Sequence, residues 1–230
     1  MSNIFTDRAA AGRALAAKVV QAAPPRPVVY ALLRGGAPVA LEIAKALKAP
    51  LDLLFVRKIG APSNEELAAA AVVDGEQPDI VFNRDVMRAA RLTEADIIAR
   101  ARPQLKEIDR RRALYMPGRR PVTARGRTAI LVDDGVATGA SMRAAIAAVR
   151  RRAPWRIIVA APVAAPQAAS ELGELADDVV CLATPDDFFG VGAYYRDFHQ
   201  LTDKEIVDLL AGYPAMPDPQ EPAESSPGQG

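Results

Sequence analysis

The chain has 230 residues, half of them hydrophobic, so it is long enough to bury one sizeable core. Its 29 basic and 28 acidic side chains leave a net charge of +1, which excludes a general electrostatic attraction to nucleic acids or membranes. The single cysteine, Cys181, excludes an intramolecular disulfide. No hydrophobic run has the length of a membrane span, and the first residues lack a secretory core, so we expect a cytoplasmic protein.

The first part of the chain alternates helices and strands, which we predict at residues 7–21 (helix), 28–33 (strand), 38–49 (helix) and 51–56 (strand). The first strand is followed at once by Arg34, Gly35 and Gly36, and the second by Arg57 and Lys58. In a parallel sheet both strands end at the same edge. The sequence therefore places glycines and three basic side chains at one edge of the predicted sheet.

This alternation stops between residues 63 and 127, which we predict to be an insertion in a single domain. Within it, residues 67–73 and 79–82 flank a turn sequence and predict a hairpin. Residues 93–115 have the apolar spacing of a helix, with Pro103 as an expected kink.

Residues 130–141, ILVDDGVATGAS, combine a buried strand, two acids, a loop of small residues and the start of a helix. A helix start leaves backbone N–H groups unpaired and partly positive, which suits a phosphate. The carboxylates of Asp133 and Asp134 can accept hydrogen bonds from a diol or hold a hydrated divalent cation. A sugar phosphate would satisfy both halves. The alternative is a plain strand-to-helix turn with acids that face solvent.

The last part of the chain returns to the α/β pattern, with helices predicted at residues 142–152 and 166–175 and strands at 156–161 and 179–183. Thr202 and Glu205 form a capping box that starts a final helix, which ends at Gly212. Residues 1–212 are thus predicted to be one domain. Residues 213–230 are rich in Pro, Ser, Gly and acids, and we expect a disordered tail.

Residues 132–141 resemble the phosphoribosyl pyrophosphate signature of type I phosphoribosyltransferases. The resemblance implies an α/β fold with an open parallel sheet flanked by helices. It also implies that Asp133 and Asp134 bind the ribose 2′- and 3′-hydroxyls and contact Mg²⁺, which travels with the pyrophosphate. The 5-phosphate would be held by the loop residues Ala137, Thr138, Gly139, Ala140 and Ser141.

The same resemblance gives roles to the residues that follow the first two strands. In the family, the loop after the first strand receives pyrophosphate, which here implicates Arg34, Gly35 and Gly36. A basic residue after the second strand also contacts pyrophosphate, and this sequence offers Arg57 and Lys58. Taken without the resemblance, these residues would be a simple turn and an exposed basic pair.

Residues 184–198 resemble the closing loop of purine-salvage members of the family. By that match, Phe188 or Phe189 would stack on the nucleobase and Arg196 would meet pyrophosphate. The stretch is shorter here than in those members. An aromatic cluster that seals the sheet edge against the last helix is the alternative. We assign no catalytic role to His199, the only histidine.

The far end of the insertion is basic, and three interpretations compete. The first is a solvated helix face, neutralised by acids such as Glu107 and Asp109. The second is contact with pyrophosphate, from a lid or a neighbouring subunit. The third, RNA binding, is not favoured because stacking aromatic residues are sparse. The residues concerned are Arg100, Arg102, Lys106, Arg110, Arg111, Arg112, Arg119, Arg120, Arg125 and Arg127.

The predicted reaction is displacement of pyrophosphate from phosphoribosyl pyrophosphate by a nitrogen nucleophile, a nucleobase or a related compound, in a homodimeric enzyme. Ala137 stands where relatives that use 6-oxopurines carry an acid, which argues against guanine and hypoxanthine. No comparable glutamate follows the first strand, which weakens the assignment of adenine as the substrate. The alternative function is a regulatory protein that binds phosphoribosyl pyrophosphate or a nucleotide with little catalysis. A third possible function, hydrolysis of a phosphate ester, is weakened because the sequence offers no convincing nucleophile or metal cluster.

Overall fold

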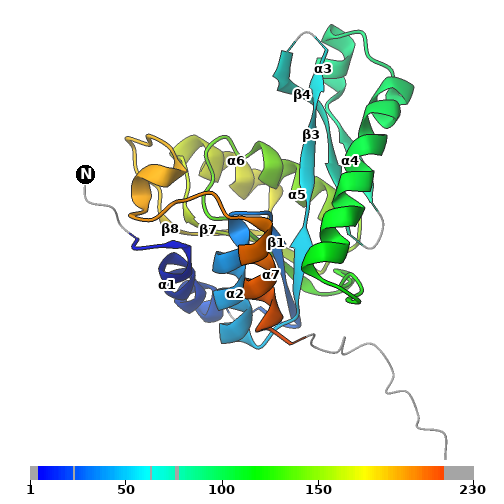
Figure 1. Cartoon of the computed structure of the whole chain (residues 1–230). Coiled ribbons are helices and arrows are strands. Elements are labelled where there is room, and N and C mark those ends of the chain that lie inside the picture. Colours follow the sequence, from blue (N-terminus) through cyan, green and yellow to red (C-terminus); the bar gives the residue numbers. More distant parts are fainter. Residues whose placement is uncertain (1–4, 23, 63, 76–77, 215–230) are drawn as a thin grey trace, which may run out of the picture.

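The computed structural model describes residues 5–22, 24–62, 64–75 and 78–214 and contains two sheets (Figure 1). A parallel sheet in the order β2-β1-β6-β7-β8 forms the core, and an antiparallel sheet in the order β3-β4-β5 stands beside it. The core strands are β1 (Pro27–Leu32), β2 (Leu51–Leu54), β6 (Thr128–Val132), β7 (Arg156–Val163) and β8 (Asp178–Ala183). The second sheet consists of β3 (Val56–Ala61), β4 (Asn64–Val73) and β5 (Asp79–Phe82).

Helices cover both faces of the core sheet, because successive residues of each strand point to opposite faces. On β1, Val29 and Ala31 pack in one hydrophobic cluster with helix residues of α1, α2 and α7, whereas Val28 and Tyr30 pack in a second cluster with α5 and α6. The helices are α1 (Arg8–Gln21), α2 (Gly36–Leu47), α5 (Ala140–Arg150), α6 (Pro166–Leu175) and α7 (Asp203–Ala211). This architecture confirms the predicted open parallel sheet flanked by helices.

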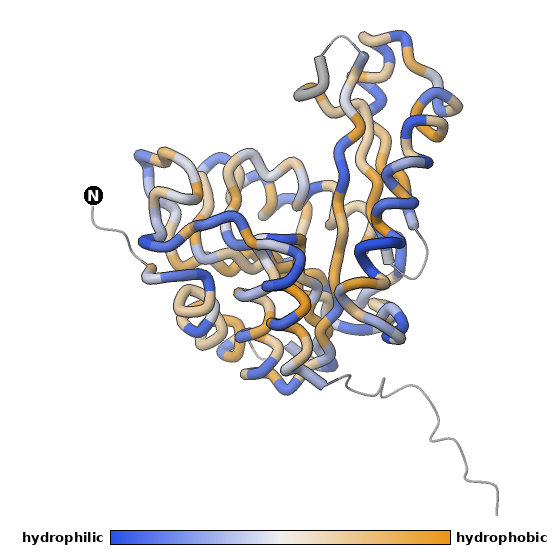
Figure 2. Tube along the Cα trace, viewed as in Figure 1, coloured by the Kyte–Doolittle hydropathy of each residue, from blue (hydrophilic) through white to orange (hydrophobic). Residues whose placement is uncertain are grey.

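The antiparallel sheet and two helices, α3 (Arg84–Ala89) and α4 (Glu94–Tyr115), form a unit that we call the hood, residues 56–115. It projects from the core in Figure 1. Hydrophilic and hydrophobic stretches alternate along α4 in Figure 2, as expected for a helix with one buried face. That face includes Ile97, Ala101 and Ile108, which are almost completely buried. The antiparallel pair β4 and β5 confirms the predicted hairpin, and α4 confirms the predicted long helix.

The prediction of the second strand was wrong at its C-terminal end. The core strand β2 stops at Leu54, and Val56 already begins β3 in the other sheet. The chain turns at Phe55, whose N–H donates to the carboxylate of Asp74 (2.6 Å). The hood thus begins earlier than the insertion predicted at residues 63–127. The short helix α3, which starts at an Asn83 cap, was not predicted either.

The C-terminal helix α7 begins as predicted, with a capping box in which Thr202 and Glu205 bond each other's backbone N–H groups. The chain stays packed slightly beyond the predicted boundary at residue 212. Tyr213 is buried, and its hydroxyl contacts the carbonyl oxygens of Ala44 (3.1 Å) and Ala49 (2.7 Å). The rest of the predicted tail, residues 215–230, lies outside the described residues. None of the described helices is long and apolar enough to cross a membrane.

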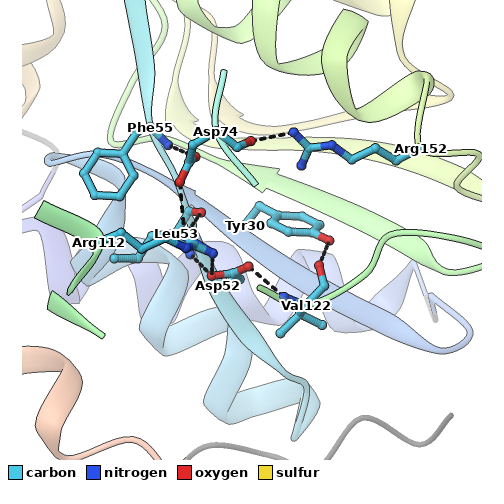
Figure 3. Close-up of polar contacts among 8 residues, drawn as sticks. All are labelled: Tyr30, Asp52, Leu53, Phe55, Asp74, Arg112, Val122 and Arg152. Atoms are coloured by element: carbon cyan, nitrogen blue, oxygen red, sulfur yellow. Dashed lines mark hydrogen bonds and ion pairs between the residues drawn. The ribbon is translucent and has the colours of Figure 1, made fainter. Parts of the chain in front are cut away.

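The hood is tied to the core by a buried group of charges that we call the ion triad: Asp52 of β2, Asp74 after β4 and Arg112 of α4 (Figure 3). Arg112 lies 2.6 Å from the Asp52 carboxylate and 3.1 Å from that of Asp74. The second oxygen of Asp52 accepts the N–H of Val122 (2.8 Å). Two carboxyl groups share one guanidinium, so ionisation of both would leave a net negative charge in a buried place.

Burial raises the pKa of Asp74 from 3.8 to about 7, against the opposing effect of Arg112. The folded protein therefore holds a proton that the unfolded chain has already released between these two pH values. We expect the free energy of unfolding to fall as pH rises from 4 to 7, by up to about 1 kcal/mol per pH unit from this group. Urea unfolding at several pH values would measure this slope.

The control is Asp74→Asn, which cannot titrate. Its stability should vary less with pH over the same interval, whatever its absolute value. Parallel curves for wild type and variant would contradict the raised pKa.

Candidate functional site

The loops after β1 and β6 meet at the carboxyl edge of the core sheet, and two glycines make this approach possible. A Cβ atom on Gly35 would lie 2.1 Å from Oδ2 of Asp134, and one on Gly36 would lie 2.4 Å from the carbonyl oxygen of Val132. Any other residue would collide at both positions. The peptide bond between Leu33 and Arg34, at the start of the first loop, is cis. The two loops that are predicted to bind phosphate groups, after β1 and after β6, thus belong to one site.

The two acids of the signature have different surroundings. Asp134 is buried, and its Oδ2 lies 2.7 Å from Nε of Arg8 in α1. Asp133 is partly buried and accepts the backbone N–H of Asp134 (2.9 Å). Burial and the adjacent Asp134 carboxylate raise the pKa of Asp133 well above its usual value. Asp134 is therefore fixed by an ion pair, and Asp133 is the more accessible acid.

The signature loop ends at Gly139, which adopts a left-handed conformation (φ 69°) and precedes the first turn of α5. Gly139 has no side chain to cap the helix, and the N–H of Ala140 has only a long hydrogen bond to the hydroxyl of Thr138 (3.5 Å), so a ligand could take its place. Ala137 and Thr138 are exposed to solvent. Arg143 donates to the Thr138 carbonyl oxygen (2.8 Å) and to Glu171 (2.8 Å), and so holds the loop against α6. The arrangement fits a phosphate at residues 137–141.

Next to the acids lies a cleft of about 360 Å³ whose polar wall consists mainly of arginines. Burial lowers the pKa of Arg57, and the positive charge of the nearby Arg111 lowers it further. Like charges gathered in a partly buried place favour a multiply charged anion. The lining residues are Arg8, Leu33, Arg34, Gly35, Phe55, Val56, Arg57, Arg111, Asp134, Phe198, Gln200 and Leu201.

The arginine that follows β1 is held by the C-terminal helix. Arg34 pairs with Asp203 of α7 (3.2 Å), and the same oxygen of Asp203 accepts the hydroxyl of Tyr115 from α4 (2.6 Å). The bond from Tyr115 and the charges of Arg111 and Arg34 lower the pKa of Asp203, while burial opposes them. A core loop, the hood and α7 therefore converge on one carboxylate beside the cleft.

Arg57 and Lys58, one of which was expected to contact pyrophosphate, lie inside a strand of the hood and not after a core strand. Both lie within β3, where successive side chains point to opposite faces. Arg57 lines the arginine cleft. Lys58 lines a groove that also includes Thr138 and Arg143.

The aromatic residues after β8 form a cluster, as in the alternative interpretation. Phe188 stacks on Tyr194, with ring centroids 5.7 Å apart, whereas Phe189 is 69% exposed. Arg196 is exposed and is not part of the cleft lining. His199 is exposed, and its ring nitrogens lie 2.7 Å from Asp197 and 2.8 Å from Glu205, which together raise its pKa. A different residue of this segment reaches the acids, because the hydroxyl of Tyr195 donates to the carbonyl oxygen of Asp134 (2.6 Å).

Sequence reasoning missed two arginines of the cleft. Arg8 was assigned to a packing helix, but its guanidinium bonds Asp134, donates to the carbonyl oxygen of His199 (2.9 Å) and lies over the ring of Phe198 (3.9 Å). Arg111 was one of ten basic residues with three competing interpretations. The apolar spacing of α4 places Arg112 on its buried face, next to Arg111, but does not show that Arg111 faces the cleft.

Four other basic residues of the insertion have defined places in the fold. Arg110 is exposed and pairs with Glu107 (2.9 Å), as in the first interpretation, whereas Arg112 belongs to the ion triad. Arg119 bonds the backbone of Tyr213 at the end of the chain. Arg127 is buried at the start of β6.

Residues 2–198 match the family model described as "Phosphoribosyl transferase domain". The chain belongs to this family. Two curated relatives from strains of Mycobacterium tuberculosis, each named "Putative phosphoribosyl transferase", are 44% identical over 207 residues, which are 90% of this chain and 46% of each relative. The chain thus spans about half the length of these relatives.

Two solved structures are similar to this chain. The crystal structure of TT1426 from Thermus thermophilus is 40% identical, covers 90% of this chain and 97% of its own, and superposes with a TM-score of 0.78. A hypothetical protein from Neisseria gonorrhoeae, solved with bound ppGpp, is 15% identical, covers 90% of this chain and 95% of its own, and has a TM-score of 0.50. This second likeness shows the fold alone.

The close approach of the two loops generates a prediction about stability. We expect Gly36→Ala to lower the free energy of unfolding by about 1–3 kcal/mol, because the added Cβ would meet backbone atoms that cannot move aside. Chemical unfolding would measure the change. Gly173→Ala in α6 is the matched control, since a Cβ there meets nothing within 4 Å. Equal stability of Gly36→Ala and wild type would contradict the close approach.

Proposed function

We propose that this protein transfers the phosphoribosyl group of phosphoribosyl pyrophosphate to a nitrogen nucleophile and releases pyrophosphate. One observation carries the proposal: the two acids stand between β6 and the loop that leads into α5, and one of them, Asp134, lines a cleft with four arginines. Phosphoribosyl pyrophosphate has a monophosphate at one end, a diol in the middle and a pyrophosphate on the anomeric carbon. Its three parts match the three parts of the site in order.

The proposed roles follow from the position of each residue. The 5-phosphate binds the N–H groups of residues 137–141 and the hydroxyls of Thr138 and Ser141. Asp133 accepts hydrogen bonds from the ribose hydroxyls, with Asp134 beside it. As the bond from the anomeric carbon to pyrophosphate breaks, the electron pair leaves with pyrophosphate, and the new bond forms to nitrogen. The arginines of the cleft stabilise the departing charge where it develops.

Magnesium fits this site chiefly through Asp133. Mg²⁺ prefers oxygen ligands and commonly uses one or two carboxylates together with substrate phosphates. Oδ2 of Asp134 is already paired with Arg8, so Asp133 is the acid better able to contact the ion or its water shell. Among the described residues, no group of three or more His, Cys, Asp or Glu side chains could hold a metal by itself. When bound, the ion would neutralise part of the pyrophosphate charge.

The acceptor is a nitrogen compound that the aromatic loop does not identify. Phe188 is stacked within its own cluster, and neither Phe189 nor Arg196 lines the cleft. The purine-type contacts expected from the sequence thus find no support in the geometry. The homodimer and the cytoplasmic location stay predictions.

Calorimetric titration with phosphoribosyl pyrophosphate and Mg²⁺ tests the proposal. We expect wild type to bind and Asp133→Asn to lose at least about tenfold in affinity, because the amide has one acceptor oxygen and a donor NH₂ group where the carboxyl group has two oxygens, and it cannot become an anion. Asp133 is preferred to Asp134 for this test, since loss of Asp134 would leave Arg8 buried and unpaired. A screen of purines, pyrimidines and small amines for pyrophosphate release then identifies the acceptor.

No binding by wild type would contradict the proposal. Binding that depends on Asp133, without release of pyrophosphate by any acceptor, would favour the regulatory alternative.

Two neighbouring arginines of α4 provide a matched test of the cleft. We expect Arg111→Ala to weaken binding of inorganic pyrophosphate by about tenfold or more, since a charge-assisted bond is lost. Arg110→Ala should bind like wild type. Both arginines pair with Glu107, but only Arg111 lines the cleft. Equal losses in the two variants would indicate a general effect of charge.

A further inference from the structure

Two consecutive arginines of α4 point to different parts of the molecule. Arg111 lines the arginine cleft, where its Nε also lies 2.6 Å from Glu107. Arg112 points toward the core and joins the ion triad (Figure 3). Successive side chains of an α-helix are ~100° apart around its axis, so the direction of one determines the direction of the next. Whatever fixes Arg112 therefore also fixes where Arg111 points.

The ion triad is well suited to hold α4 in one rotation. The side chain of Arg112 is 15% exposed, and those of Asp52 and Asp74 are 2% and 3% exposed. Arg112 also donates to the carbonyl oxygen of Leu53 (3.2 Å). Its guanidinium thus has three acceptors, two on the core strand β2 and one in the hood segment after β4. A planar guanidinium bound on several sides has little freedom to turn.

The ion triad also fixes the second hood arginine of the cleft. Oδ1 of Asp74 accepts the N–H of Phe55, at the point where the chain leaves the core for the hood. Arg57 follows two residues later in β3. Arg152 of the segment after α5 donates to the carbonyl oxygen of Asp74 and holds this residue from the other side. Both hood arginines of the cleft are therefore connected to the same carboxylate.

We propose that Arg112 is a positioning residue for anion binding: with Asp52 and Asp74, it holds the hood so that Arg111 and Arg57 already face the cleft before pyrophosphate arrives. The inference rests on the proposed function, because it assumes that the cleft receives pyrophosphate. It differs from the expected lid, which would bring its basic residues to the site only on closing. Preorganised charges lose less free energy to ordering when the anion binds.

A double-mutant cycle with inorganic pyrophosphate as the probe tests this role. The variants are Arg111→Ala, Arg112→Lys and both together, measured by calorimetry at pH 8, with thermal unfolding recorded for each. Lysine keeps the charge but cannot bridge both carboxylates. We expect Arg112→Lys to weaken pyrophosphate binding about tenfold, and the loss in the double variant to be smaller than the product of the two single losses, because part of the effect of Arg112 acts through Arg111. Arg110→Lys, on the same helix, should leave the affinity unchanged.

The outcomes separate this inference from the proposed function. If wild type binds no pyrophosphate, the proposed function and this inference both fail. If wild type binds but the two losses multiply in the double variant, Arg112 acts independently of Arg111 and the inference alone fails. Unchanged affinity of Arg112→Lys would also overturn it. If Arg112→Lys does not fold, Asp74→Asn takes its place in the cycle, with the same expectation of non-additive losses.

Discussion

The site depends on the approach of two backbone loops at the carboxyl edge of the core sheet. Gly35 and Gly36 let the loop after β1 touch the carboxylate of Asp134 and the end of β6, distances that no Cβ atom would permit. Because the two loops share one edge, the group that binds the sugar and the group that binds its leaving anion lie next to each other. The ion pair between Arg8 and Asp134 then ties α1 to the same point.

The hood adds what the core alone lacks, which is a second wall of positive charge. Arg34 comes from the core, whereas Arg57 and Arg111 come from the hood, and Asp203 of α7 holds the first of these through an ion pair. Such a wall is useful only if its charges are held in place. The buried ion triad holds the hood arginines in place. Its burial costs desolvation free energy, and only one guanidinium is present to compensate two carboxyl groups. The raised pKa of Asp74 is a consequence of that arrangement.

The sequence predicted most of the core and half of the cleft, for identifiable physical reasons. Strand, acids, small loop and helix start are contiguous at residues 130–141, so local pattern alone shows how they lie. Arg8 is 126 residues from its partner Asp134, and only the packing of α1 brings them together. The sequence places Arg57 and Lys58 together at the end of a core strand, because nothing in it marks the change of sheet at Phe55. Nothing in the spacing of α4 distinguishes Arg111 from its basic neighbours.

A crystal structure of the protein with phosphoribosyl pyrophosphate and Mg²⁺ would show directly how the ligand lies along the site. We expect the 5-phosphate on residues 137–141, the ribose hydroxyls at Asp133, and the pyrophosphate against Arg34, Arg57 and Arg111. Pyrophosphate bound outside the arginine cleft, or a ligand bound with its two phosphate ends exchanged, would contradict this expectation.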